Sequence, residues 1–304
     1  MADEPLRRSL VLDRPLDLGL TLRPLYRGRG DPTMRLSRQV AVRATRTASG
    51  PATFELRRVA TDRIEATVWG PGAETVLDRL PAFIGLEDDA SGFEPGHHPL
   101  VARLARELAG LRLGRSDAVF EALLPAILEQ KVTGREASRS LRGLTSRYGE
   151  IAPGPHGLRL QPAPATLAGL PYYAFHPFGV EQRRADLIRR VARDAGRLES
   201  LTEVEPEAAA GRLRAYPGIG PWTAAEVTLR ALGDPDAVSI GDFHLPNLVA
   251  FALAGEPRAD DSRMLELLEP WRGHRARVIR LLEASGLTAP RFGPRMPTRD
   301  IAAI

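Results

Sequence analysis

The 304-residue sequence contains no cysteine. This absence excludes disulfide bonds, thiol catalysis, zinc–thiolate sites and iron–sulfur clusters. Long apolar runs are also missing: the longest, residues 248–254, is far shorter than the ~20 residues that a membrane-spanning helix requires. The first ten residues contain acidic side chains and no apolar segment, so we expect no secretory signal and no membrane association.

Lysine is almost absent as well. Among 42 basic residues, Lys131 is the single lysine, and the formal net charge is only +4. A GC-rich genome accounts for this arginine bias, but its physical effect is a surface with many guanidinium groups suited to phosphate. A net charge this small neither requires nor excludes a nucleic-acid partner, so local features must decide.

The composition, 43% hydrophobic and 26% charged, is that of a folded globular protein. Residues 1–92 are predicted to form an N-terminal α+β domain. Its predicted elements are two strands with alternating apolar residues at 40–44 and 64–68, a turn between them at 48–51, and a helix near 73–84. The acidic segment 87–99 contains glycine and proline and is predicted to be a linker.

Residues 93–287 are predicted to be helical throughout, because apolar residues recur there at three-to-four spacing. Thr133 and Glu136 have the spacing of a capping box and predict a helix start. The predicted helices are 100–113, 117–129, 135–148, 181–195, 207–216, 222–232, 242–253, 261–271 and 275–283. Residues 288–304 are predicted to form a tail rich in proline and arginine.

The most informative segment joins two of these helices. One helix is predicted to end at Tyr216, and the residues Pro217-Gly218-Ile219-Gly220 then predict a tight hairpin in which both glycines adopt positive φ. Pro221 suits the first position of the next helix, where its missing N–H has no cost. Free amides at that helix start, together with the helix dipole, predict an anion site, and phosphate is the natural anion for an arginine-rich protein.

The string Leu213-x-x-Tyr216-Pro217-Gly218-Ile219-Gly220-x-Trp222-Thr223-Ala224 resembles the helix–hairpin–helix motif of the DNA glycosylase superfamily. It is most similar to the alkylation-repair branch, 3-methyladenine DNA glycosylase II. The resemblance covers roughly residues 100–287. It implies a mainly α fold, in which an N-terminal α+β domain accompanies an all-helical glycosylase core.

Asp242 follows the hairpin by about twenty residues, where the resemblance implies the essential aspartate of the family. An aspartate before Phe243-His244-Leu245 is also a good helix N-cap, and the two roles are compatible. A carboxylate at a helix N-terminus stays ionised near neutral pH. Glycosidic cleavage through an oxocarbenium-like transition state requires such a charge. We therefore expect Asp242 to be catalytic.

An absence on the hairpin helix bears on the product. Family members that also cut the DNA strand use a lysine there to form a Schiff base, and Trp222 occupies the matching position. The resemblance therefore implies a monofunctional hydrolase that leaves an abasic site, with no iron–sulfur cluster. No cofactor is expected for catalysis.

The resemblance also implies the contacts with double-stranded DNA. The amides of Gly218 and Gly220 and the hydroxyl of Thr223 would hold the backbone near the lesion. A wedge in the turn after residue 128 would fill the gap left by the flipped base, with Lys131, flanked by Gln130, as the candidate. Arg135 is expected at a phosphate, although a solvated surface role is the alternative for it and for Lys131. Carbonyls of Tyr216 and Ile219 are candidate ligands for a monovalent cation.

The expected base pocket departs from the family at two positions. Trp222 would form a wall and attract a cationic methylpurine through its indole face. Glu226 and Arg280, however, occupy positions where aromatic residues are familiar in this branch, and they would either face the pocket or pair with each other. We expect excision of alkylated purines such as 3-methyladenine or 7-methylguanine by a monomeric, cytoplasmic, nucleoid-associated enzyme. The alternatives are another lesion, deaminated or bulky, and an inactive protein that binds damaged DNA.

Overall fold

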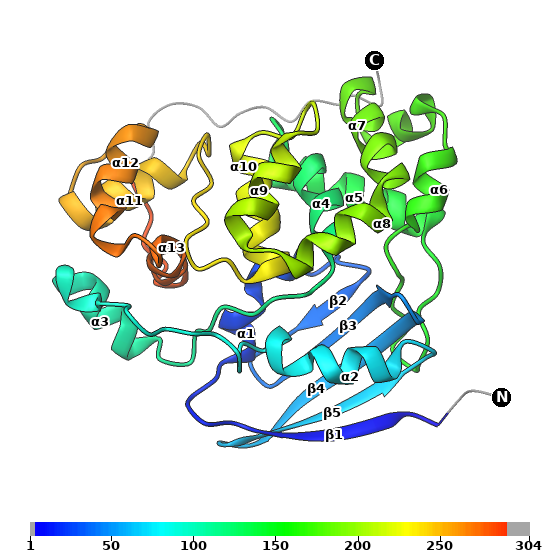
Figure 1. Ribbon diagram of the computed structural model, residues 1–304, viewed down its shortest axis with the longest axis horizontal. Coiled ribbons are helices and arrows are strands. Elements are labelled where there is room, and N and C mark those ends of the chain that lie inside the picture. Colours follow the sequence, from blue (N-terminus) through cyan, green and yellow to red (C-terminus); the bar gives the residue numbers. More distant parts are fainter. Residues whose placement is uncertain (1–3, 291–304) are drawn as a thin grey trace.

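The computed structural model describes residues 4–290, and residues 291–304 of the predicted tail lie outside this range. A layer of helices lies above a sheet that carries one long helix (Figure 1). The strands are β1 (Leu6–Val11), β2 (Met34–Leu36), β3 (Val40–Thr47), β4 (Gly50–Ala60) and β5 (Arg63–Trp69). All neighbours are antiparallel, and the order is β1-β5-β4-β3-β2.

The prediction for the N-terminal domain is confirmed in its class but not in its strand count. The turn predicted at 48–51 leads into β4, an eleven-residue strand that the sequence pattern did not reveal. Its Gly50-Pro51 start is typical of a loop, and Ala52, Thr53 and Phe54 are buried in succession, which interrupts the alternation. β1 and β2 were missed as well, because one is largely exposed and the other has three residues.

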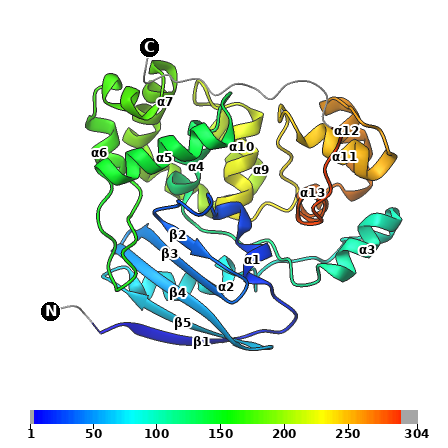
Figure 2. The ribbon, with the colours of Figure 1, turned by 180° about the vertical axis from the view of Figure 1, so that it is seen from behind.

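One face of the sheet carries α2 (Ala73–Phe83), which packs against β4 and β5. Phe54 and Phe83 meet edge to face at 5.0 Å in this core. The opposite side of β3 contacts a segment that returns from the helical region, where Val42 and Ala44 pack with residues 152–160. Figure 2 shows β2 and β3 directly below α4 and α5.

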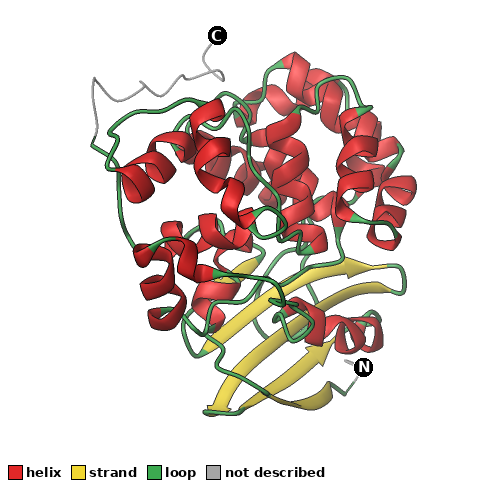
Figure 3. Cartoon of the chain, turned by 60° about the vertical axis from the view of Figure 1, so that its left-hand side comes forward, coloured by secondary structure: helices red, strands yellow, loops and turns green. Residues whose placement is uncertain are grey.

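The helical region contains two separate cores. The central helical cluster is built from α4, α5, α7, α8, α9 and α10, and the C-terminal helical cluster from α3, α11, α12 and α13. In Figure 3 most of the helices lie above the strands. The bounds of the helices are α1 (Leu18–Thr21), α3 (Pro99–Glu107), α4 (Val119–Leu128), α5 (Gly134–Tyr148), α6 (Pro164–Gly169), α7 (Gln182–Arg193), α8 (Ala195–Glu199), α9 (Pro206–Arg214), α10 (Pro221–Val227), α11 (Leu245–Ala254), α12 (Asp261–Leu268) and α13 (Arg275–Ala284). Short 3₁₀ turns and one π-helical turn, η5 (Thr228–Leu232), complete them.

The segment 87–99 is packed rather than a free linker. The buried carboxylate of Asp88 accepts two hydrogen bonds from Arg277 of α13, at 2.7 and 2.8 Å. The indole N–H of Trp271 donates to the carbonyl of Glu94 at 2.9 Å. Both partners lie more than 170 residues along the chain, so local composition could not reveal these contacts.

A buried ion pair joins the sheet to the central helical cluster. Glu121 of α4 accepts hydrogen bonds from Arg43 and Thr45 of β3, both at 2.9 Å, and from the amide of Arg46 at 2.7 Å. Both charged side chains of the pair are 9% exposed. Within residues 4–290, no helix is long and apolar enough to cross a bilayer.

Candidate active site

The hairpin between α9 and α10 lies at the predicted position, residues 217–220, and is closed by a backbone hydrogen bond. The amide of Ile219 donates to the carbonyl of Tyr216 at 2.9 Å, and Pro221 is the first residue of α10. Gly218 has φ +103°, but Gly220 has φ −94°. The prediction of positive φ is therefore right for Gly218 and wrong for Gly220. A Cβ atom built on Gly220 would meet no other atom within 4 Å, so the space beside this Cα is open.

Two side chains brace the hairpin from neighbouring helices. Gln130, which follows α4, donates from Nε2 to the carbonyl of Gly218 at 3.0 Å and to Oγ1 of Thr223 at 2.9 Å. Arg190 of α7 donates to the carbonyl of Pro217 at 2.9 Å. Thr223 itself is only 2% exposed. In this structure the buried hydroxyl of Thr223 accepts from Gln130, and its expected contact with DNA stays a prediction.

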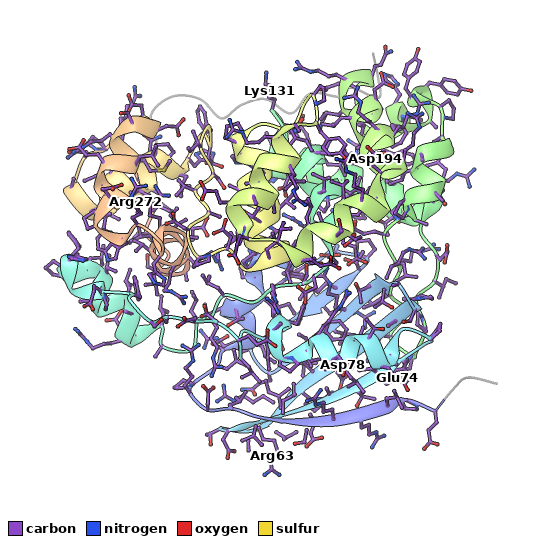
Figure 4. The ribbon with its side chains drawn as sticks, in the orientation of Figure 1. Arg63, Glu74, Asp78, Lys131, Asp194 and Arg272 are labelled. Carbon is purple, nitrogen blue, oxygen red and sulfur yellow. The ribbon has the colours of Figure 1, made fainter. Side chains whose placement is uncertain are left out.

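Lys131 follows Gln130 at the exposed turn between α4 and α5. Its φ of +56° places it in the left-handed region, which is unusual for a residue with a side chain. Figure 4 shows Lys131 pointing away from the body of the molecule, above the hairpin region. Thr133 and Glu136 form the predicted capping box at the start of α5, and Arg135 in that first turn is exposed.

Asp242 lies on the connection between the central and C-terminal helical clusters, and three hydrogen bonds hold its carboxylate. Oδ1 accepts from the amides of His244 and Leu245 at 2.7 and 2.9 Å, at the start of α11. Oδ2 accepts from the indole N–H of Trp222 at 3.0 Å. The prediction of Asp242 as the N-cap residue is wrong, because His244 is the N-cap of α11. The Asp242 carboxylate, two residues earlier, nevertheless accepts amides at this helix start and connects it to Trp222 of the hairpin helix.

A cavity of about 120 Å³ opens beside Asp242. For scale, an apolar cavity of about 150 Å³ is large enough to bind benzene. The cavity combines apolar side chains with carboxylates. It is lined by Glu226, Leu229, Ala237, Ser239, Asp242, His244, Leu245, Leu248, Ala276, Ile279 and Glu283. Trp222 is not among these residues but contacts one of them, Asp242, through its N–H.

Glu226 lines the cavity, which was one of the two arrangements predicted for it; the other was a pair with Arg280. Its carboxylate accepts from the Ser239 hydroxyl at 2.6 Å and pairs with Arg230, one turn farther along. Burial disfavours the charged form of Arg230, but the carboxylates of Glu226 and Glu129 outweigh this effect and raise the pKa of its guanidinium. The Arg230 guanidinium therefore stays charged beside the Glu226 carboxylate.

The prediction for Arg280 is wrong. Its guanidinium pairs with Glu283, donates to the carbonyl of Leu20 at 3.2 Å, and does not line the cavity. The proposed pair between Glu226 and Arg280 is not formed either, because Arg230 is the partner of Glu226. Helix periodicity reveals which side of α13 is apolar, but not which of several nearby acids an arginine reaches.

Two residues of this site were not singled out from the sequence. Ser239 and Arg230 orient Glu226, and their only sequence signal is proximity: Arg230 is one helical turn after Glu226, and Ser239 is three residues before Asp242. Among the described residues, no group of three or more His, Asp or Glu side chains has the arrangement of a metal site.

The chain is similar to known DNA glycosylases in sequence and in fold. No family model matches the chain. DNA-3-methyladenine glycosylase 2 of Escherichia coli is 29% identical over 176 residues, which cover 57% of this chain and 61% of that protein. A probable bifunctional transcriptional activator and DNA repair enzyme of Mycobacterium tuberculosis is 29% identical over 153 residues, or 49% of this chain and 30% of that protein. The chain thus spans less than two thirds of either relative.

Two solved structures share the fold. A 3-methyladenine DNA-glycosylase from Archaeoglobus fulgidus superposes with a TM-score of 0.78 at 20% identity, covering 91% of this chain and 97% of that one. An 8-oxoguanine glycosylase/lyase from Clostridium acetobutylicum, in complex with double-stranded DNA, superposes with a TM-score of 0.66 at 14% identity over 92% and 96% of the two chains. The resemblance to helix–hairpin–helix glycosylases, and to the 3-methyladenine type in particular, is confirmed.

Proposed function

Because the chain resembles the 3-methyladenine DNA glycosylases in sequence and shares their fold, we propose that it is a monofunctional DNA glycosylase that excises alkylated purines. The observation that carries this proposal is the Asp242 carboxylate, held by two backbone amides and an indole N–H at the mouth of a ring-sized cavity. The test is release of free methylpurine from duplex DNA. Damage-selective binding without release supports the alternative of an inactive damage-binding protein.

The proposed mechanism begins with extrusion of the damaged nucleotide, because the glycosidic bond cannot be reached inside the duplex. The base enters the cavity and places its sugar near Asp242. Each oxygen of an ionised carboxylate accepts more than one hydrogen bond, so Asp242 retains capacity toward the sugar and a water molecule. Its negative charge stabilises the oxocarbenium-like transition state and orients the attacking water. A cationic base leaves readily and needs no general acid.

We place the main contacts with the DNA backbone at the hairpin. Gly220 is the N-cap of α10, and the open space beside its Cα leaves room for a close backbone phosphate, while Gln130 holds the carbonyl of Gly218. Lys131 is proposed as the wedge and Arg135 as a phosphate contact, since both are exposed beside Gln130. One lesion requires one site, so a monomer acting on nucleoid DNA is proposed.

Carbonyl oxygens of the hairpin also fit a hard monovalent cation. Tyr216 uses one lone pair of its carbonyl for the Ile219 amide, and a second remains. We propose that this oxygen and the carbonyl of Ile219 hold the cation next to a phosphate of bound DNA. The catalytic step itself uses only the side chains of the protein.

The two hairpin glycines provide a matched pair of variants. Gly220→Ala is expected to change the free energy of unfolding by less than ~0.5 kcal/mol, because the site is open and its φ is ordinary. It is expected to weaken DNA binding about tenfold, because the added methyl group would keep a phosphate from approaching this amide closely. Gly218→Ala is expected to cost about 1–3 kcal/mol of stability, since its φ is +103° and a Cβ would lie 3.1 Å from Leu187.

Urea denaturation and fluorescence anisotropy with labelled duplex measure the two effects. The hairpin assignment predicts that the variants differ in kind: one loses DNA affinity and the other loses stability. If Gly220→Ala binds duplex as tightly as wild type, the phosphate contact at this amide is wrong.

Strand cleavage should not follow base release. The only lysine, Lys131, lies outside the hairpin helix, and Trp222 occupies the matching position on that helix. On a duplex with a preformed abasic site, we expect an intact strand on a denaturing gel until alkali is added, and no covalent complex after borohydride reduction. A borohydride-trapped complex would show Schiff-base chemistry and contradict the monofunctional assignment.

A second lesion class remains a candidate because the cavity is acidic where aromatic residues were expected. Deaminated bases are neutral, whereas 3-methyladenine and 7-methylguanine nucleotides are cationic. Release of hypoxanthine in preference to both methylpurines would favour this alternative.

A further inference from the structure

The cavity lacks the side chains that would recognise a base by stacking. Its lining includes no Trp, Tyr or Phe, and His244 is its only ring. The indole of Trp222 is directed by its N–H to Asp242, so the expected cation–π wall is not formed by a lining residue. Recognition of a cationic base must therefore come from another source.

Carboxylates are the alternative source. Three of them, Glu226, Asp242 and Glu283, line the cavity, and no arginine or lysine does. The nearest guanidiniums are occupied: Arg280 pairs with Glu283, and Arg230 pairs with Glu226 from the side of its own helix. Asp242 is assigned to the sugar and the water molecule, and Glu283 is partly exposed and paired with Arg280, so Glu226 is the acceptor proposed for the base itself.

The position of Glu226 is fixed to an unusual degree. Ser239 donates to Oε1 at 2.6 Å, while Arg230 binds Oε2. Arg230 is in turn anchored by Nε to the carbonyl of Pro24, in the N-terminal domain, at 2.9 Å. A surface glutamate would lose side-chain entropy on binding a ligand, whereas this one is already ordered.

We propose that Glu226 is a specificity-determining residue that accepts hydrogen bonds from N–H groups of the flipped base and favours bases with a positive charge. Both oxygens of Glu226 already accept hydrogen bonds, from Ser239 and from Arg230, so the geometry presents Glu226 to the base as an acceptor. A cationic purine whose exocyclic amine faces it gains both a hydrogen bond and a charge interaction. A neutral base gains the hydrogen bond but not the charge interaction. This inference rests on the proposed function, since it assigns the ligand of the same cavity.

The test compares wild type with Glu226→Gln on two duplexes that differ only in the lesion, cationic 7-methylguanine or neutral hypoxanthine. The amide preserves the shape and one acceptor oxygen but removes the charge. We expect the ratio of single-turnover release rates, methylguanine over hypoxanthine, to fall at least tenfold. Ser239→Ala should lower the ratio in the same direction by a smaller factor, because it only releases one oxygen of Glu226.

Glu269→Gln is the matched control, because Glu269 is also paired with an arginine, Arg272, but does not line the cavity. It should leave the ratio within about twofold of wild type. The inference is overturned if Glu226→Gln slows both lesions equally, as a merely structural residue would, or if Glu269→Gln changes the ratio as much.

A binding measurement separates this inference from the proposed function. The probe is a duplex carrying 2′-fluoro-7-methylguanine, in which fluorine prevents cleavage, compared with the same duplex carrying guanine. Wild type should prefer the cationic base and Glu226→Gln should lose that preference. If no lesion is released but this preference is present and lost in the variant, the proposed catalysis fails and the role of Glu226 stands. If wild type releases the lesion but Glu226→Gln still prefers the cationic base, the proposed function stands and the role of Glu226 fails.

Discussion

Asp242→Asn is expected to reduce the rate of base release at least ~100-fold, the size of a single strong electrostatic contribution to a transition state. The amide removes the negative charge that faces the developing sugar cation. Its oxygen can still accept from the amides of His244 and Leu245, so α11 should keep its start. The NH₂ group, however, would oppose the N–H of Trp222. Single-turnover release from methylated duplex, at saturating enzyme, measures the loss separately from DNA binding.

Asp261→Asn is the matched control for this variant. Asp261 is on the same side of the loop, where its carboxylate accepts from the amide of Gly241 at 3.0 Å, and it does not line the cavity. The rate of base release by Asp261→Asn should stay within a few-fold of the wild-type rate. Undiminished release by Asp242→Asn would show that another carboxylate supports the reaction.

Glu121→Gln is expected to destabilise the protein by about 3–5 kcal/mol, the typical cost of breaking a buried ion pair by neutralising one partner. Arg43 would keep its charge in a position that is 9% exposed, and its donor would face a neutral amide. The control is Glu150→Gln, which removes a pair with Arg46 in which Glu150 is 59% exposed. That change should cost less than about 1 kcal/mol.

Urea denaturation of the two variants checks this difference. Because Glu121 joins α4 to β3, its loss should also lower the cooperativity with which the sheet and the central helical cluster unfold. Equal losses in the two variants would mean that the buried pair is not what holds the sheet to the helices.

The features predicted from the sequence are those encoded by neighbouring residues. The hairpin at 217–220, Pro221 at a helix start, and the capping box of Thr133 and Glu136 are all local patterns with direct steric or hydrogen-bond causes. Each was found where it was expected, whereas α11 begins two residues later than Asp242 predicts, with His244 as its N-cap. The mainly α class with an N-terminal α+β domain followed from the same kind of signal.

The errors arise where distant residues decide the structure. Asp88 meets Arg277 across 189 positions, so an acidic, glycine-containing segment was interpreted as a linker although it is packed. The choice of Arg230 over Arg280 as the partner of Glu226, and the burial of Thr223 beneath Gln130, depend on how helices pack. Gly220 differs from Gly218 in φ because only one of them occupies the corner of the turn.

Analysis of the products from methylated duplex DNA is the most direct test of the central claim. The protein is incubated with DNA that carries 3-methyladenine and 7-methylguanine, free bases are separated by chromatography, and abasic sites are counted by alkali-induced strand breaks. The account predicts free methylpurines, an equal number of alkali-labile sites, and intact strands before alkali. DNA bound selectively at the lesions with no free base in solution would contradict it.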